Sequence, residues 1–324
     1  MSAGQAVTTT EALYEARGLH ITYERGRRPP VRAVDGVDLT WRRGETLGLV
    51  GESGCGKSTL ARALLGLERP SAGTIDFEDQ PVGSDLRALR RRVQLIFQDP
   101  YQSLNPRRTV GAQVQEGLAA IGVPDGEERV LRGVTALHDA GLAPADRFWR
   151  RYPHELSGGQ RQRVVIAAAL ALEPEALVCD EPVSALDVSV RTQVLRLLAE
   201  LRATRALSLL LITHDVGMAW TLCDRVAVMY LGRIVEIGTT EQVLGDPQHP
   251  YTKALLAVAP KVEQRTSARQ LLQGEPPDAA AIPSGCRFHP RCPVAFELCP
   301  TDDPQLPDAE RGAACWLVQG AAAR

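Results

Sequence analysis

Short apolar runs recur along the chain, some alternating with polar residues and some continuous, and they predict β-strands. These runs are Leu19–Tyr23, Ala33–Leu39, Thr46–Val50, Val93–Gln98, Ala176–Asp180, Ser208–Thr213 and Arg225–Tyr230, the last turning at 231–233 into Ile234–Ile237 as a hairpin. Helical periodicity falls between them, at Ser58–Leu67, Gly111–Ile121, Gly158–Leu172 and Val188–Thr204. Strands that alternate with helices predict a mostly parallel α/β core, with the chemistry at the carboxyl ends of the strands.

Two regions depart from this alternation. Residues from about 100 to about 155 have helical patterns without strong strands, which predicts an inserted helical subdomain. Eight of the 22 prolines fall within 276–307, and four of the seven cysteines follow residue 262, which predicts a small loop-rich appendage. We therefore expect a main domain at 13–261, with its helical subdomain at about 100–172, and a C-terminal extension at 262–324.

Composition and charge narrow the class of protein only slightly. The hydrophobic content of 44%, the charged content of 23% and the net charge of −2 are ordinary, and give no global attraction to nucleic acid or an anionic membrane. The longest apolar run, Val164–Leu172, is well short of the ~20 residues that span a bilayer. The polar Met1–Glu11 stretch lacks the features of a signal peptide. We expect a cytoplasmic chain whose membrane, if it serves one, is crossed by another protein.

A glycine-rich loop follows one predicted strand and opens a helix, which is the context of a phosphate-binding loop. Its residues are Gly51, Glu52, Ser53, Gly54, Cys55, Gly56, Lys57, Ser58 and Thr59. The glycines let backbone N–H groups turn toward phosphates, and the helix start adds a favourable dipole. Lys57 is expected to reach the β- and γ-phosphates of ATP, and Ser58 to ligate Mg²⁺. A ligand-free turn is disfavoured by the Lys-Ser pair and by both flanks.

Polar residues at three other strand ends complete a candidate ATP site. Asp180 is expected to hold Mg²⁺ through water, and Glu181 to orient or deprotonate the attacking water. Gln98 can contact Mg²⁺ and that water, and His214 can bind the γ-phosphate. Acidic helix capping is the alternative for the carboxylates, and an ordinary strand-end role is the alternative for the other two. The phosphate loop and the order of the motifs favour the ATP site.

The segment Leu156–Gln160 predicts a second phosphate-binding helix start. Ser157 is a good N-cap, and Gly158 and Gly159 leave the first amides without side-chain cover. A plain capping role for this Ser-Gly-Gly start stays open. Because no ligand for it is evident within the chain, we expect its phosphate to lie on another copy or a partner, in an ATPase that works as a pair.

These motifs together resemble the nucleotide-binding subunit of an ABC transporter over roughly residues 13–320. The matching motifs are the Walker A loop at 51–59, the Q-loop Gln98, the signature Leu156–Gln160, the Walker B end Asp180–Glu181, the D-loop Ser184–Asp187 with Ala185, and the switch His214. The strings Gln98–Arg107, Asp180–Ser189 and His249–Leu256 resemble the oligopeptide/dipeptide (peptide/nickel) importers. The Pro182-Val183-Ser184 version is similar to the second, F-type, of their two ATPase subunits.

The resemblance implies a P-loop ATPase core with an antiparallel β subdomain, whose ATP hydrolysis energises import of oligopeptides, dipeptides or related solutes. ATP on one subunit would be closed by Ser157, Gly158, Gly159, Gln160 and Asp187 of its neighbour. Tyr23 would stack on adenine, and a buried strand tyrosine is the alternative. The implied partners are a second ATPase subunit (a paralogue or a copy), two transmembrane permeases and an extracytoplasmic solute-binding protein, without nucleic acid. The implied place is the cytoplasmic face of the cell membrane.

The spacing of Cys286, Cys292, Cys299 and Cys315 does not by itself choose a chemistry. A cytosolic location argues against disulfides, Cys-x-x-Cys zinc knuckles are absent, and neither ferredoxin pattern fits. The run Ser284–Pro293 is similar to the C-terminal extension of peptide-importer ATPases, some of which carry a 4Fe–4S cluster. The resemblance therefore implies such a cluster, with Zn²⁺ and reduced thiols as the alternatives.

Two other functions fit the sequence less well. An ABC-type ATPase that acts on nucleic acid or ribosomes is disfavoured because only 57 residues separate Gln98 from Leu156 and the chain holds one cassette. A monomeric phosphate-loop kinase leaves Ser157–Gln160 without a role.

Overall fold

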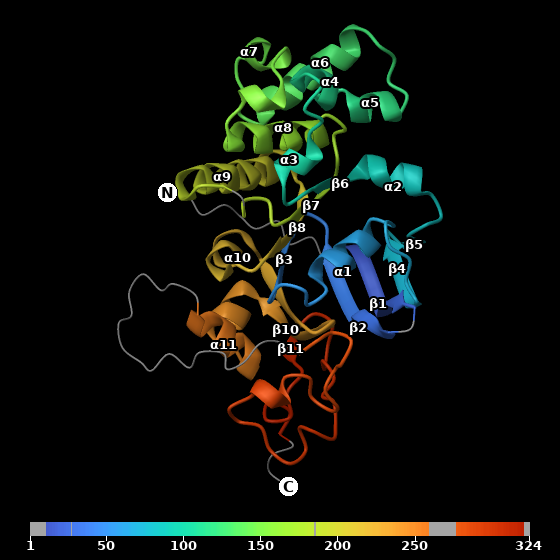
Figure 1. Cartoon of the computed structure of the whole chain (residues 1–324), viewed down its shortest axis with the longest axis vertical. Helices are drawn as coiled ribbons and strands as arrows, with labels where there is room; N and C mark the ends of the chain where they lie inside the picture. Colours follow the sequence, from blue (N-terminus) through green and yellow to red (C-terminus); the bar gives the residue numbers. More distant parts are fainter. Residues whose placement is uncertain (1–10, 27, 185, 259–276, 321–324) are drawn as a thin grey trace. The chain divides into compact units, whose positions relative to one another are not determined.

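The computed structural model describes residues 11–320 except 27, 185 and 259–276 (Figure 1). The described chain forms two compact units. The middle unit comprises residues 85–210, and the flanking unit comprises residues 11–84 together with 211–320. The expected domain boundary at 261/262 lies outside the described residues.

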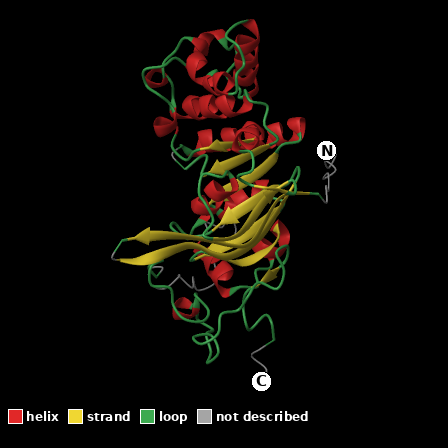
Figure 2. Cartoon of the chain, turned by 90° about the vertical axis from the view of Figure 1, so that its right-hand side faces the viewer, coloured by secondary structure: helices red, strands yellow, loops and turns green. Residues whose placement is uncertain are grey.

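The flanking unit contains an antiparallel sheet, seen as long yellow strands in Figure 2. Its strand order is β2 (Arg28–Arg42), β1 (Ala12–Arg25), β4 (Ala72–Phe77) and β5 (Gln80–Pro81). One face is closed by aromatic packing of Tyr14, whose ring centroid lies 5.4 Å from that of Trp41 and 4.9 Å from that of Phe77. This sheet confirms the expected antiparallel β subdomain.

The flanking unit also holds four strands in the order β11 (Gly312–Ala313), β10 (Arg233–Thr239), β9 (Arg225–Tyr230) and β3 (Thr46–Val50). Strands β3 and β9 run parallel and are buried along their whole length, as expected for continuous apolar runs. The hairpin between β9 and β10 is confirmed, with Leu231 and Gly232 both at positive φ. Helical segments of this unit are α1 (Lys57–Leu64), α10 (Val216–Leu222), η2 (Glu241–Gly245), α11 (Pro250–Val258) and η3 (His289–Arg291).

The middle unit is mostly helical, as the pattern predicts. Its strands β6 (Val93–Ile96) and β7 (Ala176–Asp180) pair in parallel. Its helical segments are α2 (Leu86–Arg92), α3 (Pro100–Ser103), α4 (Val110–Val114), α5 (Glu116–Ala120), α6 (Glu127–Asp139), α7 (Asp146–Trp149), η1 (Pro153–Glu155), α8 (Gly158–Leu170) and α9 (Val188–Arg205). Helices α3, α4 and α6 pack on α8, because its apolar residues surround most of the helix.

Several boundaries differ from the expected ones. The predicted helix 111–121 divides at Gln115 into α4 and α5, and the predicted strand 93–98 ends at Ile96. Strand β8 (Ser208–Thr213) matches its prediction and spans the sequence boundary between the two units. Within the part of the chain that the structure describes, no helix has the length and apolar composition needed to cross a bilayer.

The described cysteine-rich segment, 277–320, belongs to the flanking unit. Strand β11 adds it to β10, with Ala313 opposite Glu236. The buried Arg287 pairs with Asp35 of β2 and donates to the Leu231 carbonyl. Phe288 is 1% exposed and packs edge-on against the Tyr230 ring. The segment is therefore fixed to both sheets of its unit by polar and aromatic contacts.

Candidate functional site

The predicted phosphate loop joins β3 to α1, and its glycines are required by close backbone contacts. A Cβ on Gly51 would lie 2.2 Å from the Met229 carbonyl oxygen, and one on Gly56 would lie 2.0 Å from that of Ala33. Gly56 also has φ 108°, a conformation that disfavours any side chain. The loop is thus built into its sheet through backbone contacts that only glycine permits.

Lys57 lies inside this loop and is 5% exposed. Its Nζ donates to the carbonyl oxygens of Gly51 and Glu52, both at 2.8 Å. The loop therefore encloses an ammonium group, while Ser53 and Gly54 are exposed. A buried cation beneath an exposed glycine-rich turn is a favourable place for an anion. The Cys55 thiol is buried, and burial raises its pKa, so it acts as a packing residue of the loop.

Tyr23 of β1 lies beside the end of the loop. Burial is the main cause that raises the pKa of its hydroxyl, which also makes side-chain hydrogen bonds with Thr59 and Glu68. The residue is half-buried within its strand.

The expected catalytic side chains of the middle unit meet at the carboxyl ends of β6 and β7. Gln98 lies two residues beyond β6, and its Nε2 donates to Glu181 Oε2 at 3.2 Å. Glu181 has φ 47°, a backbone conformation that is uncommon for residues other than glycine. Asp180, the last residue of β7, is half-buried. The parallel pairing of Ile96 with Cys179 explains why these residues are neighbours.

The signature segment forms a closed helix cap. Ser157 Oγ accepts from the Gln160 N–H at 3.3 Å, and Gln160 Oε1 accepts from the Ser157 N–H at 3.0 Å. Among the described residues, a Cβ on Gly158 would make one ordinary contact, with Leu186, whereas a Cβ on Gly159 would lie 2.3 Å from Val190 Cγ1 of α9. Gly159 is therefore needed for helix packing as well as for any open amide.

The remaining predicted residues stand at element ends. His214 follows β8 and is exposed, while the next residue, Asp215, caps α10 by accepting from the Met218 N–H. Asp187 is the exposed N-cap residue of α9. Of the predicted D-loop, Ala185 lies outside the described residues.

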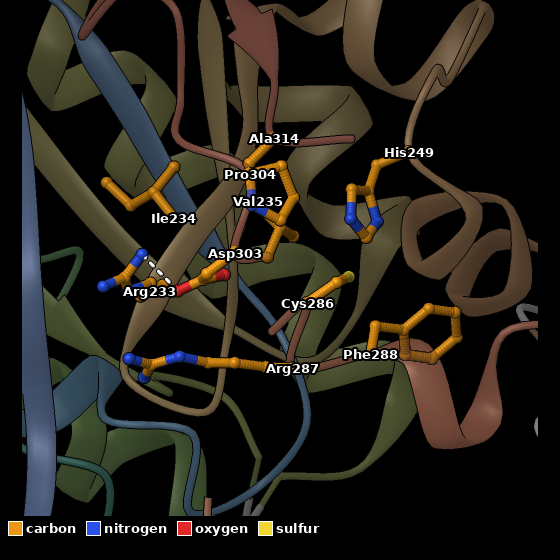
Figure 3. Close-up of a pocket in the computed structure, with 10 residues that line it drawn as sticks. All are labelled: Arg233, Ile234, Val235, His249, Cys286, Arg287, Phe288, Asp303, Pro304 and Ala314. Carbon is orange, nitrogen blue, oxygen red and sulfur yellow. Dashed lines mark ion pairs between the residues drawn. The ribbon is translucent and has the colours of Figure 1, made fainter. Parts of the chain in front are cut away.

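The four C-terminal cysteines gather in one part of the flanking unit. Cys299 and Cys315 are buried, Cys286 and Cys292 are half-buried, and the Cys286 N–H donates to the Cys299 carbonyl at 2.8 Å. Burial first, and then the three neighbouring thiols, raise the pKa of Cys286 to about 11. Figure 3 shows Cys286 beside His249, in a small cavity near the 2.6 Å ion pair of Arg233 with Asp303.

Among the described residues, however, no group of three or more His, Cys, Asp or Glu side chains is arranged to hold a metal ion. The expected 4Fe–4S cluster and its zinc alternative therefore gain no support from the geometry.

Two residues that the sequence did not assign to the site contact the phosphate loop. Tyr251 Oη accepts from the Glu52 N–H at 3.0 Å, and Arg291 binds the Glu52 carboxylate with both of its terminal nitrogens. The strings at 249–256 and 284–293 contain these residues, but they indicate a family rather than a contact. Local patterns carry no signal for partners so distant in sequence.

Comparison with known proteins identifies the class that this fold and site define. Residues 34–184 match the family model described as ABC transporter, and residues 235–299 match that described as oligopeptide/dipeptide transporter, C-terminal region. A structure of cbiO1 from Clostridium perfringens, part of an ABC transporter complex, is similar with TM-score 0.65 and 30% identity over 73% of this chain and 92% of that chain. A dimeric ATP-binding cassette, MJ0796 bound to ADP and Pi, has TM-score 0.63 and 29% identity over 70% of this chain and 98% of that chain.

Curated relatives are similar over nearly their whole length. A Brucella ovis protein named for peptide import and ATP binding is 46% identical over 309 residues, 94% of this chain and 96% of that protein. A Bacillus subtilis protein named for oligopeptide transport and ATP binding is 45% identical over 324 residues, 95% of this chain and 96% of that protein. The chain belongs to the ABC transporter family, among the ATP-binding proteins of peptide import. The resemblance and the fold class expected from the sequence are thus confirmed.

Proposed function

We propose that this chain binds and hydrolyses ATP to energise the import of oligopeptides, dipeptides or related solutes through a membrane permease. The observation that carries the proposal is the buried Lys57 ammonium enclosed by the glycine-rich loop. The named activities of the Brucella and Bacillus relatives support the same conclusion.

In this proposal each motif residue has one role. The loop 51–59 binds the phosphates, with Lys57 neutralising their charge, and Tyr23 stacks on adenine. Glu181 orients the attacking water and His214 contacts the γ-phosphate. The hydroxyl, amide and carboxylate oxygens that would hold Mg²⁺ form a donor set that suits this ion, and they belong to Ser58, Gln98 and Asp180. The metal would supply charge neutralisation of the phosphates.

The signature helix start is proposed to act on the ATP of a second ATPase subunit. Ser157, Gly158, Gly159 and Gln160, with Asp187, would contact that nucleotide across the dimer. The dimeric MJ0796 structure, similar over 70% of this chain, supports a paired arrangement. The proposed partners are a copy or paralogue of this chain, two permeases and a solute-binding protein, with this chain peripheral at the cytoplasmic face of the membrane. Similarity to the F-type subunit stays a prediction.

Glu181→Gln tests the catalytic assignment. The variant should bind ATP, slow turnover by roughly 10²-fold or more, and trap a dimer, because a neutral amide cannot act as the base. ATPase rate, nucleotide binding and mass by light scattering measure these effects. Glu200→Gln, an exposed glutamate on α9, is the matched control and should match the unchanged chain. Normal turnover of the Glu181 variant would refute its role.

A pull-down from solubilised membranes tests the coupling to transport. Recovery of two polytopic permeases with the tagged chain supports the proposal. Recovery of ribosomes or DNA in their place contradicts it, and would favour the nucleic-acid class of ABC ATPase.

The four C-terminal cysteines are proposed to bind a metal cluster. We propose a 4Fe–4S cluster on Cys286, Cys292, Cys299 and Cys315 because the run Ser284–Pro293 resembles the extension of peptide-importer ATPases, some of which carry such a cluster, and because four thiolates suit it. Anaerobic purification followed by iron, sulfide and zinc analysis decides this point. Iron with acid-labile sulfide supports the cluster, whereas stoichiometric zinc or metal-free protein overturns it.

A further inference from the structure

Glu52, the second residue of the phosphate loop, is held through all three of its polar groups. Its N–H donates to Tyr251 Oη at 3.0 Å, and its carbonyl accepts from Lys57 Nζ at 2.8 Å. Its carboxylate accepts from Arg291 Nη1 at 2.8 Å and from Nη2 at 3.0 Å. Two of these three partners come from the C-terminal part of the chain.

The Arg291 contact is a bidentate ion pair in a mostly buried place. The Arg291 side chain is 5% exposed and the Glu52 side chain 22% exposed. Paired N–H···O bonds between ionised groups are stronger and more directional than neutral ones. A second bond, from Nη1 to Tyr230 Oη at 3.3 Å, fixes the guanidinium further. Removing either partner of such a pair would leave the other charge with little water around it. Arg291 and Glu52 are therefore expected to stay paired.

Tyr251 is fixed as firmly as Arg291. It is fully buried, its ring centroid lies 4.6 Å from that of Tyr230, and its N–H donates to His249 Nδ1. The hydroxyl that accepts from Glu52 is therefore part of a rigid aromatic cluster rather than a mobile surface group.

We propose that Arg291, together with Tyr251, is a positioning residue for nucleotide binding. By holding Glu52, the two residues fix the backbone at the start of the loop, which supplies both carbonyls that surround Lys57 Nζ. The cysteine-rich segment, in which Arg291 directly precedes Cys292, thereby sets the affinity of the loop for ATP. This inference rests on the proposed role of loop 51–59 as the phosphate site. The competing explanation is a staple that stabilises the segment without affecting the loop.

The test is a titration of the full chain with ATP that carries a fluorescent ribose label, in the presence of Mg²⁺. Arg291→Gln and Glu52→Gln should each weaken binding on the order of tenfold, and the double variant should be no weaker than the worse single one. Arg291→Lys, which keeps the charge without the bidentate geometry, should lie between Arg291→Gln and the unchanged chain. Tyr251→Phe keeps the ring and should weaken binding roughly threefold.

The matched control is Arg233→Gln, because Arg233 joins the same segment to β10 through Asp303 and Gln305, and its side-chain bonds among the described residues are with that segment rather than with the loop. It should lower the melting temperature and leave the nucleotide affinity unchanged. Equal loss of affinity in Arg233→Gln and Arg291→Gln would show that Arg291 only stabilises the segment and has no specific effect on the loop. Additive effects of the Glu52 and Arg291 variants, or affinities within twofold of the unchanged chain, would also overturn the inference. If Arg291→Gln does not fold, the Lys and Tyr251→Phe variants decide by the same criterion.

Lys57→Ala separates this inference from the proposed site. Loss of binding in that variant confirms the loop as the phosphate site, whatever the Arg291 variants do. Unchanged binding in Lys57→Ala refutes the site assignment itself, and the inference with it.

Discussion

The two glycine-rich helix starts of this chain, before α1 and before α8, are stabilised in opposite ways. The start of α8 is closed by its own residues, since Ser157 and Gln160 exchange hydrogen bonds across three positions of sequence. In the loop before α1, Glu52 is held by Tyr251 and Arg291, which are 199 and 239 positions away. The conformation of the signature helix start is thus fixed by neighbouring residues in the sequence, and that of the phosphate loop by residues distant in the sequence.

The surroundings of the glycines also differ between the two helix starts. Gly51 and Gly56 face backbone carbonyls, which cannot move aside without distorting a sheet. Gly159 faces the end of a side chain, Val190, and Gly158 faces open space with one ordinary contact. Substitution should therefore be tolerated less in the phosphate loop than in the signature segment, and this comparison is testable.

The largest effect is expected from Gly56→Ala. The added Cβ would meet the Ala33 carbonyl at 2.0 Å in a residue with φ 108°, so the loop must change conformation. We expect the free energy of unfolding to fall by at least about 3 kcal/mol and measurable ATP binding to be lost. Denaturant unfolding and nucleotide titration measure these two effects. Gly54→Ala is also at positive φ, but its Cβ would have no neighbour within 4 Å in the described part of the chain, so it should lose only about 1 kcal/mol. Equal losses would contradict the role of the carbonyl contact.

The second-largest effect is expected from acid, which should destabilise the contacts of Tyr251 that hold the phosphate loop. His249 is fully buried, and this burial is the main cause that lowers its pKa from 6.5 to about 4. A hydrogen bond with the Ala314 backbone opposes the shift, and the positive charge of Lys253 adds to it. The Nδ1 of His249 accepts from the Tyr251 N–H and cannot do so when protonated. The unfolded chain takes up this proton near pH 6.5 and the folded chain only near pH 4, so stability is lost as the pH falls through this window.

The loss should reach about 3 kcal/mol at its lower end. Chemical unfolding at several pH values measures it. His249→Asn, which keeps an acceptor but does not titrate, should have a flatter profile between pH 6.5 and 4 than the unchanged chain. The buried Glu236, which accepts from the His249 N–H, is present in both proteins and cancels in the difference. Identical profiles would show that His249 does not titrate as described.

Gly159→Ala should have a smaller effect on stability than Gly56→Ala or acidification to pH 4. Its Cβ would lie 2.3 Å from Val190 Cγ1, so α8 and α9 must separate or Val190 must rotate, at a cost of about 1–3 kcal/mol. Gly158→Ala is the neighbouring control and should stay within about 1 kcal/mol of the unchanged chain, since its Cβ has ordinary contacts only. Thermal unfolding compares the two variants. A larger loss for Gly158→Ala would contradict the packing role of Gly159.

The smallest effect is expected from Ser157→Ala. Loss of the hydroxyl that accepts from the Gln160 N–H should destabilise the middle unit by about 1 kcal/mol. ATP binding by the isolated chain should not change, because the proposed ligand of this helix start belongs to the partner. Turnover in the assembled transporter should fall. A loss of nucleotide affinity in the isolated chain would contradict that assignment.

Local patterns were sufficient to predict most of the strands, but not β4, β5 or β11, and the motifs carried the resemblance to the family. Continuous apolar runs such as Ser208–Thr213 became strands with matching bounds, because burial on both faces of a parallel sheet leaves a local signal. The neighbouring positions of Gln98 and Glu181 also followed from the sequence, since parallel strands bring their carboxyl ends to one edge. The capping box of Ser157 and Gln160 is equally local.

The surroundings of the phosphate loop, in contrast, depended on how the chain folds. Gly159 was expected to expose amides, and the structure adds a packing contact with Val190 that no local pattern encodes. Arg291 lies in a segment expected to be a separate appendage, yet it binds Glu52 of the loop. Hydrophobic periodicity and motif spacing report on neighbours in sequence, whereas contacts between residues 52 and 291 exist only once the chain has folded and buried both partners.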